Sequence, residues 1–86
     1  MVTARITTLR VSHRTQQKII QKHGLQLDEL EDLLVDVRGL NGRWDDDPTR
    51  GRRLLLEVFV RGRRVLVVLY PTDTLGTWNL GSAYFV

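Results

Sequence analysis

The residues of this sequence that could do chemistry are a histidine beside a lysine and two groups of arginines. Lys22 and His23 are neighbours, and imidazoles can act as general acids or bases because their ordinary pKa of roughly 6.5 lies near neutrality. Arginines keep their charge and bind phosphate oxygens through paired hydrogen bonds, which suits RNA or DNA. Two groups of three occur, Arg50, Arg52 and Arg53, then Arg61, Arg63 and Arg64. A histidine that caps a helix and arginines that solubilise a surface are the alternative interpretations.

Two further sets of side chains invite a functional interpretation. The three consecutive aspartates Asp45, Asp46 and Asp47 have carboxylates that point in divergent directions. No further ligands follow them at the spacing of a calcium-binding loop, so we predict a solvated turn and no metal site. No phosphate-binding glycine loop, nucleophile elbow or zinc-protease motif occurs, and we predict no cofactor. The aromatic residues could stack on bases, although packing against the core or a sheet edge is the simpler expectation. They are Trp44, Tyr70, Trp78, Tyr84 and Phe85.

Composition predicts one small domain over residues 1–86. The 86 residues are 42% hydrophobic and include no cysteine, which excludes disulfides and thiolate chemistry. No signal peptide and no run of 18 apolar residues is present, so we expect a soluble, cytoplasmic protein without a membrane partner. The net charge of +3 is a mild argument for a polyanionic partner.

Two helices are expected in the first half of the chain. The segment 5–11 is β-branched and predicts a short N-terminal strand. Ser12 then offers an N-cap for a helix over residues 13–23, which Gly24 ends. The second helix is predicted from an apolar stripe at positions i, i+3, i+4 and i+7. Asp28 and Glu31 form its expected N-terminal capping pair, and Gly39 is expected to end it. The stripe consists of Leu30, Leu33, Leu34 and Val37.

An antiparallel sheet is expected in the second half. Residues 39–53 contain three glycines and a proline and predict a long surface loop, in which a short strand around Arg43 and Trp44 is an alternative. Apolar runs at 54–60 and 65–70, joined by a glycine-containing turn, predict a β-hairpin, and residues 77–86 a final strand. The expected fold is α+β: a short N-terminal strand, two helices, then a three-stranded antiparallel sheet. The arginine groups flank a strand of roughly 23 Å and therefore occupy opposite ends of it.

The order and spacing of several short motifs are similar to those of a known family. Lys22-His23-Gly24, the acidic helix after them, and Arg53 opening a strand that leads to Gly62-Arg63-Arg64-Val65-Leu66-Val67-Val68 resemble BrnT-like toxins of type II toxin–antitoxin systems, in the RelE/ParE superfamily. The resemblance runs roughly over residues 12–83. It implies a compact α+β fold, metal-independent ribonuclease activity on messenger RNA, and a cognate antitoxin as protein partner.

Carried over by position, the resemblance implies two sets of site residues. The catalytic set is His23, Arg53, Arg64 and Tyr84. The RNA- and phosphate-binding set is Lys18, Lys22, Arg50, Arg52 and Arg63. Family members usually continue from Ser-Ala with an arginine and a basic helix, whereas here Ser82-Ala83 is followed by Tyr84. The alternative is a non-catalytic module of the same fold that binds nucleic acid or protein, including a homodimer through the C-terminal strand.

Overall fold

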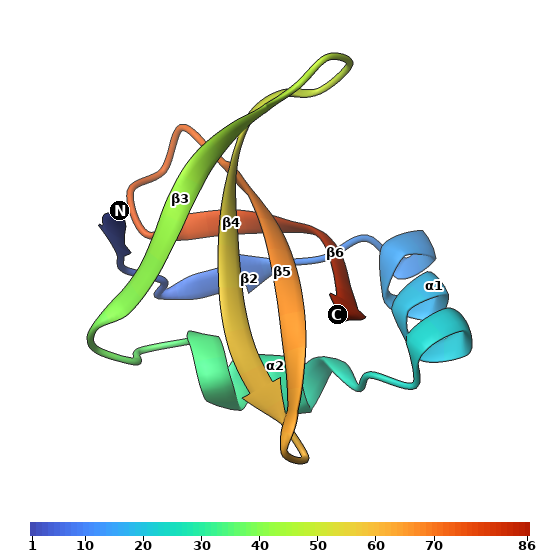
Figure 1. The fold of residues 1–86 in the computed structure, drawn as a ribbon. Helices are drawn as coiled ribbons and strands as arrows, with labels where there is room; N and C mark the ends of the chain where they lie inside the picture. Colours follow the sequence, from blue (N-terminus) through green and yellow to red (C-terminus); the bar gives the residue numbers. More distant parts are fainter.

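The structure is a computed structural model that describes all 86 residues of the chain. It contains two helices and six strands that form one curled sheet (Figure 1). In chain order these are β1 (Val2–Ala4), β2 (Thr8–Arg10), α1 (His13–His23), α2 (Leu27–Leu34), β3 (Leu40–Asp47), β4 (Gly51–Val60), β5 (Arg63–Pro71) and β6 (Thr77–Phe85). The α+β class is confirmed.

The sheet is larger than predicted and is mixed. Its strand order is β1-β3-β4-β5-β6-β2, with every pair antiparallel except β2 with β6. The expected three-stranded antiparallel sheet is therefore wrong. The N-terminal segment forms two short strands at opposite edges of the sheet rather than one strand over residues 5–11. Between them, the backbone N–H groups of Thr7 and Thr8 donate to the carbonyl of Gly76.

The strand β3 replaces most of the loop predicted over residues 39–53. Gly42 to Asp47 pair with Leu56 to Gly51 of β4, so the alternative strand around Arg43 and Trp44 is confirmed and extended. Three aspartates have low strand propensity, but the neighbouring strand supplies a full ladder of hydrogen-bonding partners. The three aspartates belong to this strand and not to a solvated turn, which is a second correction.

The first helix follows the sequence pattern closely, and the second is shorter than expected. The Ser12 side chain accepts a hydrogen bond from the Thr15 backbone N–H, and Gly24 adopts the left-handed conformation at the C-terminus of α1. For α2 the capping pair is Gln26 with Glu29 instead of Asp28 with Glu31. The helix ends at Leu34, so Val37 and Gly39 lie outside it.

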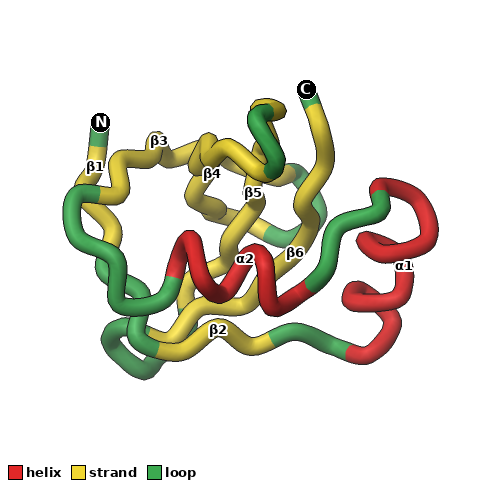
Figure 2. Tube along the Cα trace, turned by 90° about the horizontal axis from the view of Figure 1, so that it is seen from below, coloured by secondary structure: helices red, strands yellow, loops and turns green.

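The core fills the concave side of the curled sheet. Alternate residues of β4 and β5 point into it and are buried together with apolar residues of both helices. Figure 2 shows α2 lying across this side of the sheet and α1 standing beside β6. The β4–β5 hairpin turns through Arg61 and Gly62, which both have positive φ angles, as a two-residue type I′ hairpin turn requires. This turn brings Arg61 to the end of α1, where its guanidinium contacts the carbonyl of Gly24.

Candidate nucleic-acid interface

His23 and Tyr84 come together although 60 residues separate them in sequence. His23 is the last residue of α1, and Tyr84 lies near the end of β6. Their ring centroids are 6.0 Å apart, with the ring planes tilted by 43°. Both side chains are half-buried, so each packs against the protein and remains accessible to solvent. The pair combines an imidazole and a phenol, the two groups here that can carry protons in a reaction.

Arg64 lies on the same face of the sheet as Tyr84. Tyr84 pairs with Leu66 of β5, and Arg64 is two residues before Leu66 on that strand. Diagonal neighbours of this kind have their Cα atoms about 7–8 Å apart, within reach of long side chains. Arg64 is exposed and forms no ion pair, so its guanidinium group is free to bind an anion.

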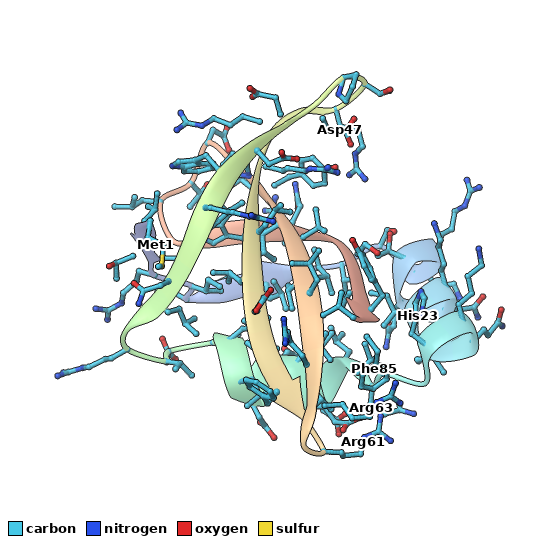
Figure 3. The ribbon with its side chains drawn as sticks, in the orientation of Figure 1. Met1, His23, Asp47, Arg61, Arg63 and Phe85 are labelled. Carbon is cyan, nitrogen blue, oxygen red and sulfur yellow. The ribbon has the colours of Figure 1, made fainter.

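The other two arginines of the β4–β5 turn are held by neighbouring groups. Arg61 donates from Nη2 to the carbonyl of Gly24 at 2.9 Å and forms an ion pair with Glu29 at 3.3 Å. The guanidinium carbon of Arg63 lies 4.0 Å from the ring centroid of Phe85. Figure 3 shows these arginines and Phe85 gathered below the end of α1 that carries His23. We call His23, Arg61, Arg63, Arg64 and Tyr84 the hairpin-end cluster.

The solvent side of α1 forms a basic stripe beside this cluster. Arg14, Lys18 and Lys22 follow one another at four-residue spacing and are exposed, so they lie on one side of the helix. They line a shallow hollow of about 480 Å³ that contains no hydrophobic residue. His23 faces Tyr84 instead, and Lys22 is the member of the stripe next to it in sequence. The stripe can bind a phosphate backbone but does not converge on the imidazole.

Arg53 lies at the opposite end of β4 and is neutralised there. Its Nε donates to Asp45 at 2.7 Å and its Nη1 to Asp47 at 3.3 Å. The pKa of Arg53 is raised, above all by the hydrogen bond to Asp45. Six residues separate Arg53 from the residue that pairs with Arg64, or roughly 20 Å along the strand. The structure therefore does not bring Arg53 together with His23, Arg64 and Tyr84.

Asp47 is the centre of a polar cluster around Arg53. Its Oδ1 accepts from the backbone N–H groups of Thr49 and Arg50, and its Oδ2 accepts from the Tyr70 hydroxyl at 3.0 Å. The pKa of Asp47 is lowered, chiefly by the hydrogen bond from Thr49 and then by that from Tyr70. The guanidinium of Arg50 stacks on the Tyr70 ring at 4.0 Å.

The hydrogen bonds to Asp47 predict that the free energy of unfolding depends on pH. Because the pKa of Asp47 in the folded protein lies below its ordinary value of 3.8, the folded state resists protonation more than the unfolded state does. Its contribution to the free energy of unfolding is present above pH 3.8 and is lost as the pH falls through the lowered pKa. We expect Asp47→Asn to weaken this acid dependence and to lower stability at neutral pH.

Urea denaturation between neutral and acidic pH measures both effects. The matched control is Asp46→Asn, because Asp46 is the exposed neighbour in β3 and forms no ion pair. Equal pH profiles for the two variants would contradict the role given to Asp47.

The predicted residues thus fall into separate places. His23 contacts Tyr84, Arg64 lies on the same face of the sheet as Tyr84, and Arg63 stacks on Phe85, the residue after Tyr84. Lys18 and Lys22 lie on α1, the helix that ends at His23. Arg50 and Arg53 belong to the cluster around Asp47, and Arg52 stacks on Trp44 with 4.0 Å between guanidinium carbon and ring centroid.

Arg14 was missed from sequence, although its helical spacing from Lys18 and Lys22 indicates it. Arg61 was named with the arginines of the turn, but no sequence signal indicates its contact with Gly24.

The structure also bears on the expected partners. No group of three or more histidine, aspartate or glutamate side chains is placed to hold a metal ion, and neither helix has the length and apolarity needed to cross a membrane. β6 is paired on both sides at Trp78 and Asn79, so this part of the strand offers no free edge for a homodimer. Comparisons with protein-family models, curated proteins and solved structures gave no match.

Proposed function

We propose that this chain is a metal-independent endoribonuclease that acts on messenger RNA in the cytoplasm, as the toxin of a type II toxin–antitoxin system. The observation that carries the proposal is the contact of His23 with Tyr84, whose ring centroids are 6.0 Å apart, with Arg64 on the same face of the sheet as Tyr84. The resemblance of Lys22-His23-Gly24 and the following segments to BrnT-like toxins supports the same class.

The proposed reaction needs only groups that this cluster contains. The ribose 2′-oxygen attacks the adjacent phosphorus, its proton passes to a base, and the 5′-oxygen leaves with a proton from an acid. His23 is the proton carrier, since an imidazole can both accept and donate. Arg64 stabilises the charge that builds on the phosphate oxygens. Tyr84 holds the imidazole ring and can donate its hydroxyl proton.

RNA would approach along the basic stripe of α1. Arg14, Lys18 and Lys22 contact phosphates and set the path of the strand without reading its sequence. An antitoxin with an acidic surface would cover the same stripe and the arginines of the β4–β5 turn. Arg53 would support the fold of the β3–β4 end through its ion pairs with Asp45 and Asp47. Because it lies at the far end of β4 from Arg64, it has no part in the proposed reaction.

Expression in growing bacteria tests the proposal. We expect growth arrest together with new 5′-ends in messenger RNA, and we expect Arg64→Gln to relieve both. The control is Arg43→Gln, an exposed arginine in β3, which should behave like the unchanged chain. Normal growth with intact messenger RNA at full expression of the folded chain would count against ribonuclease activity.

A second candidate is a non-catalytic module that binds nucleic acid. It is favoured by one observation, the engagement of the Arg53 guanidinium by Asp45 and Asp47, which removes a predicted phosphate stabiliser. This candidate expects RNA affinity that falls steeply with salt concentration and no cleavage products. Cleaved RNA would exclude it.

A further inference from the structure

A pocket opens at the part of the curled sheet where β1, β3 and the start of β6 meet. It has a volume of about 540 Å³ and is lined largely by apolar groups. Trp44 and Trp78 form its walls, and Leu54, which is fully buried, reaches it from the core. Leu75 is fully exposed at its rim. A volume of this size is typical of small-ligand sites.

The two indole rings are held in a fixed arrangement. Their centroids are 6.0 Å apart and their planes are inclined by 30°. The Trp78 Nε1–H donates to the carbonyl of Arg5 at 3.1 Å, which fixes the orientation of that ring. Both rings are half-buried, so each keeps a part of its surface open to the pocket or to solvent. A flat aromatic ligand can stack on such a surface without reorganising the fold.

One arginine lines the pocket and a second one contacts Trp44 in its wall. Its lining includes Arg5 and no carboxylate, and Arg52 lies over Trp44, 4.0 Å from the ring centroid. Asp46 pairs with Arg52 across the strands, but neither of them forms an ion pair. A ligand that combines an aromatic ring with a phosphate would complement both the indoles and these arginines.

We infer that this pocket binds a nucleobase, with the base against the indole rings and its phosphate at Arg52. The base comes from a free nucleotide or from a single-stranded RNA, and stacking of this kind is tolerant of base identity. The site is separate from the hairpin-end cluster, so the inference stands whether or not the chain cleaves RNA.

The indole N–H signals in an NMR titration report directly on the pocket, because the chain has two tryptophans and both line it. We expect uridine and adenosine monophosphates to shift both indole signals in a saturable way. Ribose 5-phosphate, which lacks the base, should shift them much less than the nucleotides do. A tetrauridylate binding more tightly than the mononucleotide would identify RNA as the source, and equal affinity would identify the free nucleotide.

Two variants separate the contribution of ring stacking to nucleotide affinity from the contribution of the arginine charge. Trp78→Phe keeps a ring but reduces its area, and Arg52→Gln removes the charge; each should weaken nucleotide binding by about tenfold, the order of one stacking contact. The control is Arg43→Gln on the same strand as Trp44, which should bind like the unchanged chain. Indole signals that no nucleotide or RNA shifts, or that ribose 5-phosphate shifts equally, would overturn the inference.

Discussion

Replacing His23 by asparagine is expected to lower the rate of RNA cleavage by about 10²- to 10⁴-fold, the range that a positioned general acid or base contributes. His23 is the imidazole that contacts Tyr84, and asparagine keeps polarity at the helix end while removing the proton carrier. RNA affinity should stay nearly unchanged, because the basic stripe formed by Arg14, Lys18 and Lys22 is intact. Single-turnover cleavage and equilibrium binding on the same variant measure the two quantities.

The chain offers a matched control in its second histidine. His13 begins α1 and is exposed, so His13→Asn should cleave RNA at the unchanged rate. Tyr84→Phe keeps the ring beside His23 and removes only the hydroxyl, so it should lose activity only to the extent that the hydroxyl donates a proton. Equal rates for His23→Asn and His13→Asn would refute the role of His23.

Leu69→Ala is expected to lower the free energy of unfolding by about 2–5 kcal/mol, through lost burial and the cavity left behind. Leu69 is fully buried and pairs with Leu54 of β4 and Leu80 of β6, so it lies at the centre of the curled sheet. A domain of this size has a total stability of about 5–15 kcal/mol, so the loss is a large fraction of it. Urea denaturation should show a lower midpoint with an unchanged slope.

A second leucine provides the comparison. Leu75 is fully exposed, and Leu75→Ala should change the free energy of unfolding by no more than about 0.5 kcal/mol. Similar losses in the two variants would mean that the packing of the sheet differs from the one described above.

The parts of the fold that sequence predicts are those with a local signal. Ser12 and Gly24 mark both ends of α1, and the apolar runs at 54–60 and 65–70 with the glycine turn between them mark the β4–β5 hairpin. β3 had no such signal, because a strand that contains three aspartates is stabilised by pairing with β4 rather than by its own propensity. The pairing of β1 and β2 with distant strands is likewise a long-range property, which no pattern in residues 1–11 encodes.

In the candidate site, too, residue types could be predicted from the sequence, whereas their contacts depend on the fold. His23 and the turn arginines could be named from residue type, and their proximity to Tyr84 follows only from the fold. Arg53 was expected as a phosphate stabiliser, but its neutralisation by Asp45 depends on the β3–β4 register.

Cleavage of a short end-labelled RNA by the purified chain in the presence of EDTA decides whether the hairpin-end cluster is a ribonuclease site. Attack by the 2′-oxygen leaves a 2′,3′-cyclic phosphate on one product and a 5′-hydroxyl on the other. We expect these ends, and we expect a single 2′-deoxy substitution at the cleaved nucleotide to abolish cleavage there. RNA that stays intact under these conditions, or a 2′-deoxy site that is cut equally well, would contradict the proposed function.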